Sequence, residues 1–449
     1  MKLKKLVALL LCAAVMLPLA ACVKKPGGSE NSSGTSSSES TTVTPTKDKD
    51  TSIVATDKSR KGPAVQDLMK GITKGKGVSK KPDSRFENAA ASFALDLFRD
   101  EYKSGRKTLV SPLSVFTALA MTQNGAEDRT LSEMQKTLGG LDRDVLNAYM
   151  NAYLAELTGK DSALKCANSL WIDSRLDVKT SFLQKNADFY SAQAYKADFT
   201  RKNTVNEINS WVNKNTNGMI KKLVDEFDPL TVMVLMNALC LEAEWDDPYT
   251  DNCVREGTFK NAKGNLVKAE YMYSQETEYI ETENATGFVK YYKGGKFAFV
   301  ALLPNEGTSI DSYIASLTGK GFLSALNSRK NTQVNTQMPK FKCEYSNSLV
   351  DTLKKMGMST AFDRDRANFS SMATLKNENI YISDVIHKTF IEVAEKGTRA
   401  GAVTAVIKEA SAAMPVEQPK EVRLTRPFVY AIIDTRTNLP LFIGAQTDI

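Results

Sequence analysis

The segment YISDVIHKTFIEVAEKGTRAGAVTAVI, residues 381–407, decides the fold of this chain, because one strand pattern in it is followed by a second strand pattern that runs into a loop. Its first part, residues 381–393, is the apolar, β-branched run of a strand. Further on, small or β-branched residues occupy alternate positions, the spacing of one strand face: Thr398, Ala400, Ala402, Thr404 and Val406. Residues 408–420 are polar, contain two prolines and show no period, which predicts an exposed loop. Residues 398–406 thus have the pattern of a strand but run directly into a loop. Other strand patterns lie before and after this segment, so the role of the additional strand pattern needs an explanation.

Helical patterns dominate the first half of the chain and strand patterns the second. Apolar residues have helical spacing in residues 86–102, 128–140, 144–157 and 205–218. Strand-like runs cover residues 231–245, 287–304, 332–345, 379–393 and 422–435. One further helical stretch, 346–358, interrupts them. Helices first and strands later, without strict alternation, predict an α+β fold, and we expect a single domain over residues 83–449 because no second linker divides them.

The N-terminal end, MKLKKLVALLLCAAVMLPLAAC, has the pattern of an export signal. Lysines are followed by an apolar run too short to favour a membrane span and then by small residues, which predicts a signal peptide over residues 1–21. The end of this stretch resembles a bacterial lipobox, and that resemblance implies that Cys22 becomes the lipid-bearing first residue. The alternative is an ordinary cleaved leader with a chance cysteine. We expect an exported protein, anchored by lipid at Cys22 on the outer face of a bacterial membrane.

Residues 22–82 have the composition of a linker. They are rich in Ser, Thr, Lys, Gly and Pro, and residues 29–42, SENSSGTSSSESTT, are of low complexity. Such a composition buries too little apolar surface to offset the entropy lost on ordering. We therefore expect a disordered tether between the lipidated cysteine and the domain.

The single histidine, His387, limits the chemistry of the chain. A Ser-His-Asp hydrolase would need it as the base. The strand period places it on one face with Val385, Thr389 and Ile391, where a hydrogen-bonded core histidine is the simpler interpretation. No GxSxG, HExxH, GxGxxG or phosphate-loop pattern is present. We expect neither an enzyme nor a metal site, and no cofactor.

Charge and cysteine content give two further expectations. The net charge is +7, but no basic stripe with interleaved aromatic residues is found, so we expect no nucleic-acid partner. Beyond the leader the cysteines are far apart in sequence: Cys166, Cys240, Cys253 and Cys343. Export permits disulfides, but Cys166 and Cys240 lie in apolar strand-like runs, where a free cysteine behaves as a small hydrophobic residue. Free thiols are therefore favoured over disulfides.

Many ordered motifs resemble the serpins, the serine-protease inhibitors that trap their targets. The segment 381–407 is similar to the serpin hinge, and other motifs follow in the family's order: residues 111–115 (SPLSV), 118–139, 234–245, 338–362 and 426–444. The resemblance covers nearly all of residues 83–449. It implies the serpin fold, in which helices pack around a large central β-sheet plus smaller sheets. It also implies a monomer with an exposed reactive-centre loop at about residues 395–421.

In serpins this loop is bait. A protease forms an acyl-enzyme with it, and the freed hinge then inserts into the main sheet as a new strand. The resemblance assigns the hinge to Glu395, Gly397, Thr398, Ala400, Ala402 and Thr404. The inward residues are narrow enough to pass between packed strands, and Gly397 lets the chain bend where insertion begins. A suicide inhibitor is thus implied, the alternative being a non-inhibitory serpin that acts as a surface binding protein.

The family's usual spacing from the hinge glutamate, here Glu395, places the cleaved bond at Ser411–Ala412. Counting back from Arg426 places it nearer residues 416–417, so the loop is longer than usual. The hinge count is favoured because the depth of insertion decides whether the trap works. The small, uncharged residues around Ser411 predict an elastase-like or subtilisin-like serine protease as the partner. Cysteine proteases stay an alternative, since they also form acyl-enzymes.

Two clusters are carried over from matching motifs. The first, the shutter, lies under the main sheet where the strands must part: Ser111, Ser114, Asn237 and His387. The second, the breach, lies at the top of the sheet where insertion starts: Trp245, Lys340 and Glu395, with an ion pair between the last two. Buried polar groups need partners, so we expect a hydrogen-bonded set around His387 with a gating role rather than a catalytic one.

Overall fold

The computed structural model describes residues 63–159, 162–376, 378–398 and 418–449, without the side chains of residues 166, 167, 237 and 238. These residues belong to one unit, Lys61–Ile449. Its helices are α1 (Ser84–Glu101), α2 (Pro112–Thr122), α3 (Asp128–Thr137), α4 (Arg143–Leu157), α5 (Thr180–Tyr190), α6 (Lys202–Asn215), α7 (Ile310–Ser316), α8 (Gly319–Asn327) and α9 (Val350–Lys355), with 3₁₀ turns η1 (Gln123–Gly125), η2 (Asp251–Cys253) and η3 (Ser359–Phe362). Its strands are β1 (Val65–Asp67), β2 (Thr108–Val110), β3 (Leu164–Asp173), β4 (Asp177–Val178), β5 (Gln193–Ala197), β6 (Met233–Leu241), β7 (Ala243–Glu244), β8 (Val254–Lys260), β9 (Leu266–Glu281), β10 (Ala285–Tyr291), β11 (Phe297–Pro304), β12 (Lys330–Pro339), β13 (Phe341–Ser348), β14 (Ala373–Thr374), β15 (Asp384–Ala394), β16 (Gly397–Thr398), β17 (Lys420–Arg423), β18 (Phe428–Asp434) and β19 (Pro440–Gln446).

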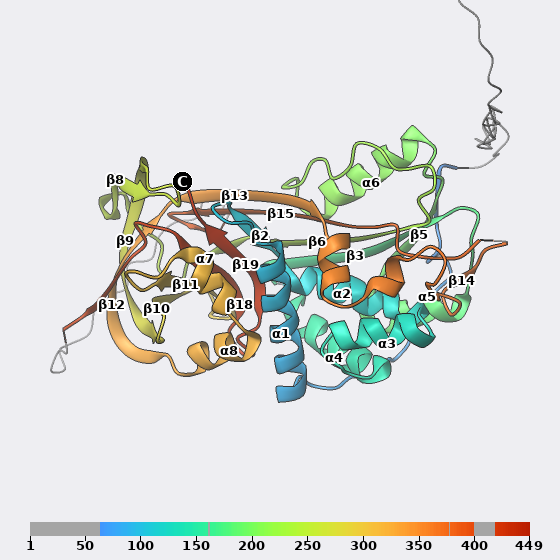
Figure 1. Cartoon of the computed structure of the whole chain (residues 1–449), viewed down its shortest axis with the longest axis horizontal. Coiled ribbons are helices and arrows are strands. Elements are labelled where there is room, and N and C mark those ends of the chain that lie inside the picture. The colour runs from blue at the N-terminus through green and yellow to red at the C-terminus, as the bar shows by residue number, and fades with distance from the viewer. Residues whose placement is uncertain (1–62, 160–161, 377, 399–417) are drawn as a thin grey trace, which may run out of the picture. The chain divides into compact units, whose positions relative to one another are not determined.

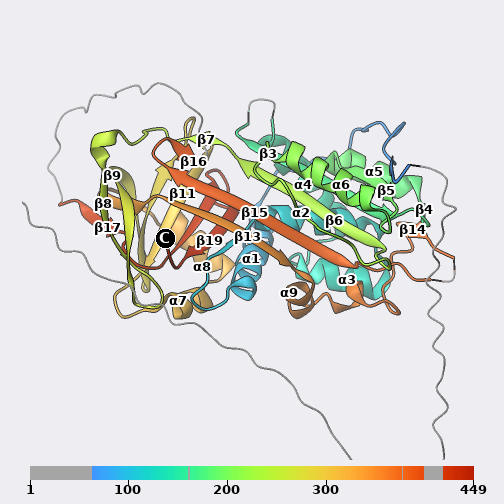
Figure 2. The ribbon, with the colours of Figure 1, turned by 90° about the horizontal axis from the view of Figure 1, so that it is seen from above.

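Two large sheets organise the described residues. The main sheet has the strand order β1-β5-β3-β6-β15-β16-β7, with β13 paired to the other side of β15. The second sheet has the order β17-β12-β9-β10-β11-β18-β19-β2, with β8 paired to β9. Figure 2 shows β13, β15 and β6 running side by side along the main sheet. Helices and these mixed sheets confirm the predicted α+β fold.

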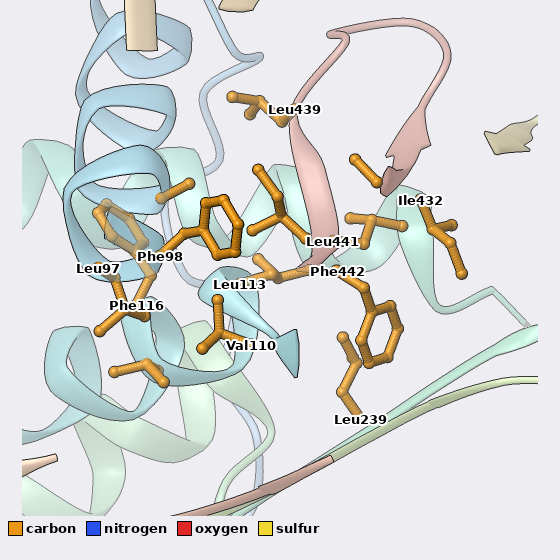
Figure 3. Close-up of a cluster of buried hydrophobic side chains, with 14 of the residues drawn as sticks. Leu97, Phe98, Val110, Leu113, Phe116, Leu239, Ile432, Leu439, Leu441 and Phe442 are labelled. Atoms are coloured by element: carbon orange, nitrogen blue, oxygen red, sulfur yellow. The ribbon is translucent and has the colours of Figure 1, made fainter. Parts of the chain in front are cut away.

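Helices cover both faces of the main sheet. Figure 1 shows α6 on one face and α2 to α5 on the other. The contact with α6 is made by a separate apolar cluster that includes Trp171, Ile208 and Trp211. Where α1 and α2 meet β18 and β19, large apolar side chains fill the interior, among them Phe116 and Phe442 (Figure 3). The apolar helix faces predicted from the sequence spacing are thus buried against the sheets.

The predicted tether is too long at its C-terminal end. Instead of leaving the fold at residue 82, the chain joins it at β1, which pairs with the edge strand β5. The backbone N–H of Gly75 donates to Asp188 Oδ1 at 2.6 Å, and that of Lys80 donates to the carbonyl of Ala148 at 2.9 Å. The side chains of Leu68, Met69 and Ile72 pack against the core. The edge of a sheet offers unpaired N–H and C=O groups, so a mostly polar segment with a few apolar residues can bind there.

This segment is expected to stabilise the domain. A chain that begins at residue 83 should unfold at a temperature several degrees lower than one that begins at residue 63, because it loses the β1–β5 ladder and the burial of three apolar side chains. Partial burial of those side chains contributes on the order of 1 kcal/mol each. Differential scanning calorimetry of the two truncated chains measures the difference. Equal unfolding temperatures would show that residues 63–82 contribute no stability.

Candidate functional site

The chain after β15 returns at once into the main sheet. A turn at residues 395–396 leads into β16, which lies between β15 and β7. Thr398 is opposite Val393 on one side and Ala243 on the other. Its side chain is buried, with 3% exposed. The first residues of the predicted hinge are therefore already placed as the start of an additional strand.

Gly397 allows β16 to enter. Its φ is 147°, a conformation that residues with a side chain rarely adopt. A Cβ at this position would lie 2.1 Å from the carbonyl oxygen of Ala243 and 2.8 Å from the Cα of Glu244. Any other residue would have to push β7 away. The bend and the close approach thus both require glycine at the position where the sequence predicts the start of insertion.

Three consecutive carbonyl groups, from Ala394 to Lys396, are held by one neighbouring segment. Trp245 donates to the first through Nε1 and to the third through its backbone N–H, both at 2.9 Å. The backbone N–H of Tyr249 donates to the second at 2.9 Å. The indole of Trp245 is buried and stacks on Tyr292 with the ring centres 4.4 Å apart. Trp245 therefore forms a rigid support for the turn before β16.

The ion pair predicted between Lys340 and Glu395 is present. Lys340 Nζ lies 2.7 Å from Glu395 Oε1 and 3.0 Å from Glu270 Oε2. Partial burial opposes the charge on Lys340, but hydrogen bonds to the two carboxylates outweigh it, and the pKa of Lys340 is raised. Burial likewise opposes the charge on Glu395, yet the hydrogen bond from Lys340 leaves the pKa of Glu395 lowered. Both groups are thus charged at neutral pH, and they join the turn to the connection between β12 and β13 and to β9.

A buried cation behind Trp245 was not predicted from the sequence. Lys290, in β10, has a side chain that is only 2% exposed, and its Nζ lies 2.8 Å from Glu276 Oε1. The same ammonium group lies 4.5 Å from the ring centre of Tyr249 and 5.6 Å from that of Trp245. A cation over an aromatic face is attracted to it, so Lys290 helps to hold both residues that bind the turn. A single lysine inside an apolar run carries no sequence signal for this role.

Tyr292 is the second group that sequence reasoning missed. Its hydroxyl shares a hydrogen bond with the hydroxyl of Thr398. Burial raises the pKa of Tyr292 far above its usual value, so the phenol stays protonated and can donate. The two tyrosines in VKYYKGG, residues 289–295, mark an aromatic-rich strand end, but not which hydroxyl meets the hinge.

His387 is buried where β15 passes over the start of α2. Its Nε2 accepts a hydrogen bond from the backbone N–H of Ser111 at 3.1 Å, so the ring proton sits on Nδ1. The hydroxyl of Ser111 donates to the carbonyl of Leu441 at 2.9 Å, and that of Thr389 donates to the carbonyl of Leu109 at 2.7 Å. The predicted set around His387 is therefore made mainly by side-chain bonds to the backbone, which tie β15 to the layer below it.

Ser114 and Asn237 are the other two predicted members of the shutter. Ser114 is buried, one turn further along α2 than Ser111. The backbone of Asn237 pairs with Asn168 in the β3–β6 ladder, and its side chain lies outside the described residues. The hinge residues Ala400, Ala402 and Thr404, the bond Ser411–Ala412 and the lipidation site Cys22 also lie outside them.

His387 should make stability depend on pH. Burial lowers the pKa of His387 to about 4, whereas an unfolded chain titrates near 6.5. Below pH 6.5 the unfolded chain gains a proton that the folded chain does not bind, so stability falls as the pH drops from 6.5 to 4. The loss approaches about 3 kcal/mol at pH 4.

The variant His387→Gln keeps an acceptor for Ser111 but cannot titrate. Its unfolding temperature should therefore fall less steeply than that of the wild type between pH 7 and pH 4. Thermal unfolding at matched pH values for both proteins isolates the histidine, because every carboxyl group is shared. Parallel profiles would contradict the assignment.

The comparison with known families agrees with this geometry. The family model described as serpin (serine protease inhibitor) matches residues 88–449. This chain belongs to the serpin family. Serpins are generally protease inhibitors rather than catalytic enzymes, and some members do not inhibit.

This serpin is also similar to individual relatives and solved structures. It is 32% identical over 363 residues to an uncharacterized serpin-like protein of Thermococcus kodakarensis, a match that covers 80% of this chain and 84% of that protein. The native structure of the thermophilic serpin tengpin matches with a TM-score of 0.82 and 42% identity, covering 86% of this chain and 100% of tengpin. Tengpin in its latent state matches with a TM-score of 0.73 and 39% identity, covering 83% and 100%.

Three further features of this serpin are its cysteines, its possible metal-binding groups and the character of its helices. Cys253 and Cys343 are free thiols, which confirms the prediction for these two cysteines. Among the described residues, no group of three His, Cys, Asp or Glu side chains is arranged to hold a metal ion. None of the described helices combines the length and the apolar character needed to cross a membrane.

Proposed function

We propose that this serpin is a suicide inhibitor of serine proteases. Its loop would be cleaved at Ser411–Ala412, and the residues after Thr398 would then insert between β15 and β6. The observation that carries the proposal is β16, which already lies between β15 and β7 in the orientation that insertion needs. The remaining loop would lengthen this strand rather than start a new one.

Within the described residues, part of β15 has no ladder partner on the side where that strand would enter. On this side β15 pairs with β6 at Asp384 and Val385, and with β16 at Val393 and Ala394. Within the described residues the stretch 386–392 has no ladder partner on this side, although β13 pairs with all of it on the other. A strand entering here would satisfy backbone groups along the length of β15.

The register of β16 predicts which residues would meet. Each residue further along the loop would lie one residue further back along both β15 and β6. Thr404 would then lie between His387 and Asn237, so the polar loop residue would meet the polar shutter. The remaining inward residues would lie beside the buried Ile391, Thr389 and Val385. Small side chains fit these positions because the packed interior leaves little free volume.

The described fold is more similar to the native state of tengpin than to its latent state. The TM-score is 0.82 against the native state of that protein and 0.73 against its latent state. A chain held in the native arrangement keeps the free energy of further strand pairing available. That reserve is what a trapping inhibitor must release after cleavage.

The residues around the proposed bond define the class of protease. Residues 410–414, ASAAM, are small and uncharged, so an enzyme that accepts them needs a shallow apolar primary pocket. Elastase-like and subtilisin-like serine proteases have that specificity. We further propose that the inhibitor is exported and anchored by lipid at Cys22, as the leader sequence indicates, and thus acts outside the cell.

The test is to mix the purified chain, residues 22–449, with pancreatic elastase and with subtilisin. A covalent complex that survives boiling in detergent is expected, with the loop fragment starting at Ala412 in mass spectrometry. If every enzyme yields only cleaved serpin, inhibition is refuted and the protein is a non-inhibitory binding protein.

A further inference from the structure

We infer that this serpin has a binding site for small molecules that carry a carboxylate, beside the segment that leads from β17 to β18. The site is a cavity of about 340 Å³ lined by the ends of the α1–β2, β8–β9, β11–α7 and β17–β18 connections, and its positive charge comes from Arg426 and Lys260. None of its lining residues belongs to the hinge, the shutter or the breach. The inference is therefore independent of the proposed inhibitory function.

Arg426 is a partly buried cation without an acidic partner. Its Nη2 donates to the carbonyl of Pro304 at 2.6 Å, and within the described part of the chain its guanidinium group makes no other hydrogen bond and no ion pair. Arg143, Arg175 and Arg329 are also partly buried, and each of them forms an ion pair with a carboxylate. Because buried charges are normally paired, the exception at Arg426 favours the binding of an anion from solution.

The pKa values of two arginines reflect this difference. Hydrogen bonds to Asp173 raise the pKa of Arg175, although burial opposes them. Burial lowers the pKa of Arg426, because the charge of Glu306 offsets it only in part. A guanidinium group keeps its proton at neutral pH, so Arg426 stays charged and bears the cost of its burial. A bound anion would relieve that cost.

Lys260 is the second cation of the cavity. It is the last residue of β8, and its backbone N–H donates to the carbonyl of Thr425, next to Arg426. Its ammonium group is exposed and makes no hydrogen bond or ion pair with any residue that the structure describes. A carboxylate bound at Arg426 would accept parallel hydrogen bonds from the guanidinium fork, and Lys260 would add attraction at the same cavity.

The other walls of the cavity define the rest of the ligand. Asp311 lines it as well, and its two carboxylate oxygens accept hydrogen bonds from the hydroxyl groups of Tyr102 and Ser104, each at 2.6 Å. This negative charge disfavours a doubly charged phosphate ester relative to a singly charged carboxylate. Ile310 and Pro427 add apolar surface. The volume is at the lower end of the about 300–1,000 Å³ of small-molecule sites, so the expected ligand is a small monocarboxylate with an apolar body.

The test measures the binding of para-fluorobenzoate to the chain 22–449 by fluorine NMR at constant ionic strength. The neutral para-fluorobenzamide has nearly the same shape without the charge, and phenyl phosphate is a competitor with a second charge. We expect a Kd of about 1 mM for fluorobenzoate, which is ordinary for a ligand of this size. Fluorobenzamide should bind at least about tenfold more weakly, because it cannot form charge-assisted hydrogen bonds.

Three variants locate the binding site. Arg426→Gln keeps a donor for the carbonyl of Pro304 but removes the charge, and should weaken fluorobenzoate binding at least about tenfold. Lys260→Gln should weaken it about threefold, as expected for an exposed charge. Lys263→Gln is the matched control, because Lys263 is exposed on the turn that follows β8 and does not line the cavity. Its Kd should equal that of the wild type.

Three results would contradict the inference. Equal affinity of the wild type for fluorobenzoate and fluorobenzamide would overturn it, and this comparison does not depend on the folding of any variant. An equal loss in Lys260→Gln and Lys263→Gln would overturn it as well, since the attraction would then come from the general charge of the surface. Tighter binding of phenyl phosphate than of fluorobenzoate would overturn the assignment to monocarboxylates.

Discussion

Replacing Thr398 with arginine is expected to turn this inhibitor into a substrate. Thr398 is 3% exposed and lies between Val393 and Ala243, with its hydroxyl bonded to Tyr292. A guanidinium group in that position would be buried without a partner, which costs several kcal/mol, about 3 or more. Insertion past residue 398 would slow, and the acyl-enzyme would hydrolyse first. With elastase, Thr398→Arg should form at least about tenfold less stable complex while being cleaved at an unchanged rate.

The matched control for this variant is Thr398→Val. Valine has nearly the shape of threonine and loses only the hydroxyl, so it separates the bond to Tyr292 from the effects of size and charge. Trapping by Thr398→Val should stay within a few-fold of the wild type. Unchanged trapping by Thr398→Arg would show that insertion at this position is not part of the mechanism. Equal loss in both variants would instead place the effect in the hydroxyl pair.

The parts of this site that could be predicted from the sequence are those whose pattern is local. The alternation in β15 places His387 with Val385 and Thr389 on the buried face, as the structure shows. The glycine before an alternating small-residue run, Gly397, marks a position where two backbones approach closely. The pairing of Lys340 with Glu395 came from motifs that resemble the family, because the two residues are far apart in sequence and no spacing rule connects them.

The groups missed are those whose partners lie on another strand. Lys290 lies in an apolar run, and nothing in that run indicates that its lysine forms a buried ion pair. Its partner Glu276 is on the neighbouring strand β9. Only the sheet register brings the two together behind Trp245. The hydroxyl pair of Tyr292 and Thr398 depends in the same way on β16 entering the sheet beside β7. Composition cannot reveal either contact.

The boundaries predicted for the tether and for the helix over residues 346–358 differ from those in the structure. The tether was expected to extend to residue 82, because its few apolar residues could not form a core alone, but an existing sheet edge supplies the rest. The helix expected over 346–358 is limited to α9, Val350–Lys355, since β13 continues to Ser348 along β15. In both cases pairing with a strand already in place outweighs the local preference.

Cleavage of the loop is expected to make this protein more stable. In the wild type, residues after Thr398 would fill the β6-facing side of residues 386–392, which has no ladder partner among the described residues. Their small side chains would be buried beside residues 385–391. The unfolding temperature of the cleaved protein should exceed that of the intact protein by more than about 10 °C, which for a domain of this size corresponds to several kcal/mol. Calorimetry before and after limited digestion, with the cut located by mass spectrometry, measures the shift.

The control is the Thr398→Arg variant cleaved at the same bond. Both proteins then carry the same break in the chain, so the loss of loop connectivity cancels, and only the capacity to insert differs. The cleaved variant should gain much less than the cleaved wild type, because extension of β16 would have to bury the new guanidinium beside Val393. If the cleaved wild type unfolds at or below the temperature of the intact protein, the native arrangement holds no reserve of strand pairing. The loop is then passive, and trapping by insertion is energetically unsupported, whatever protease is tried.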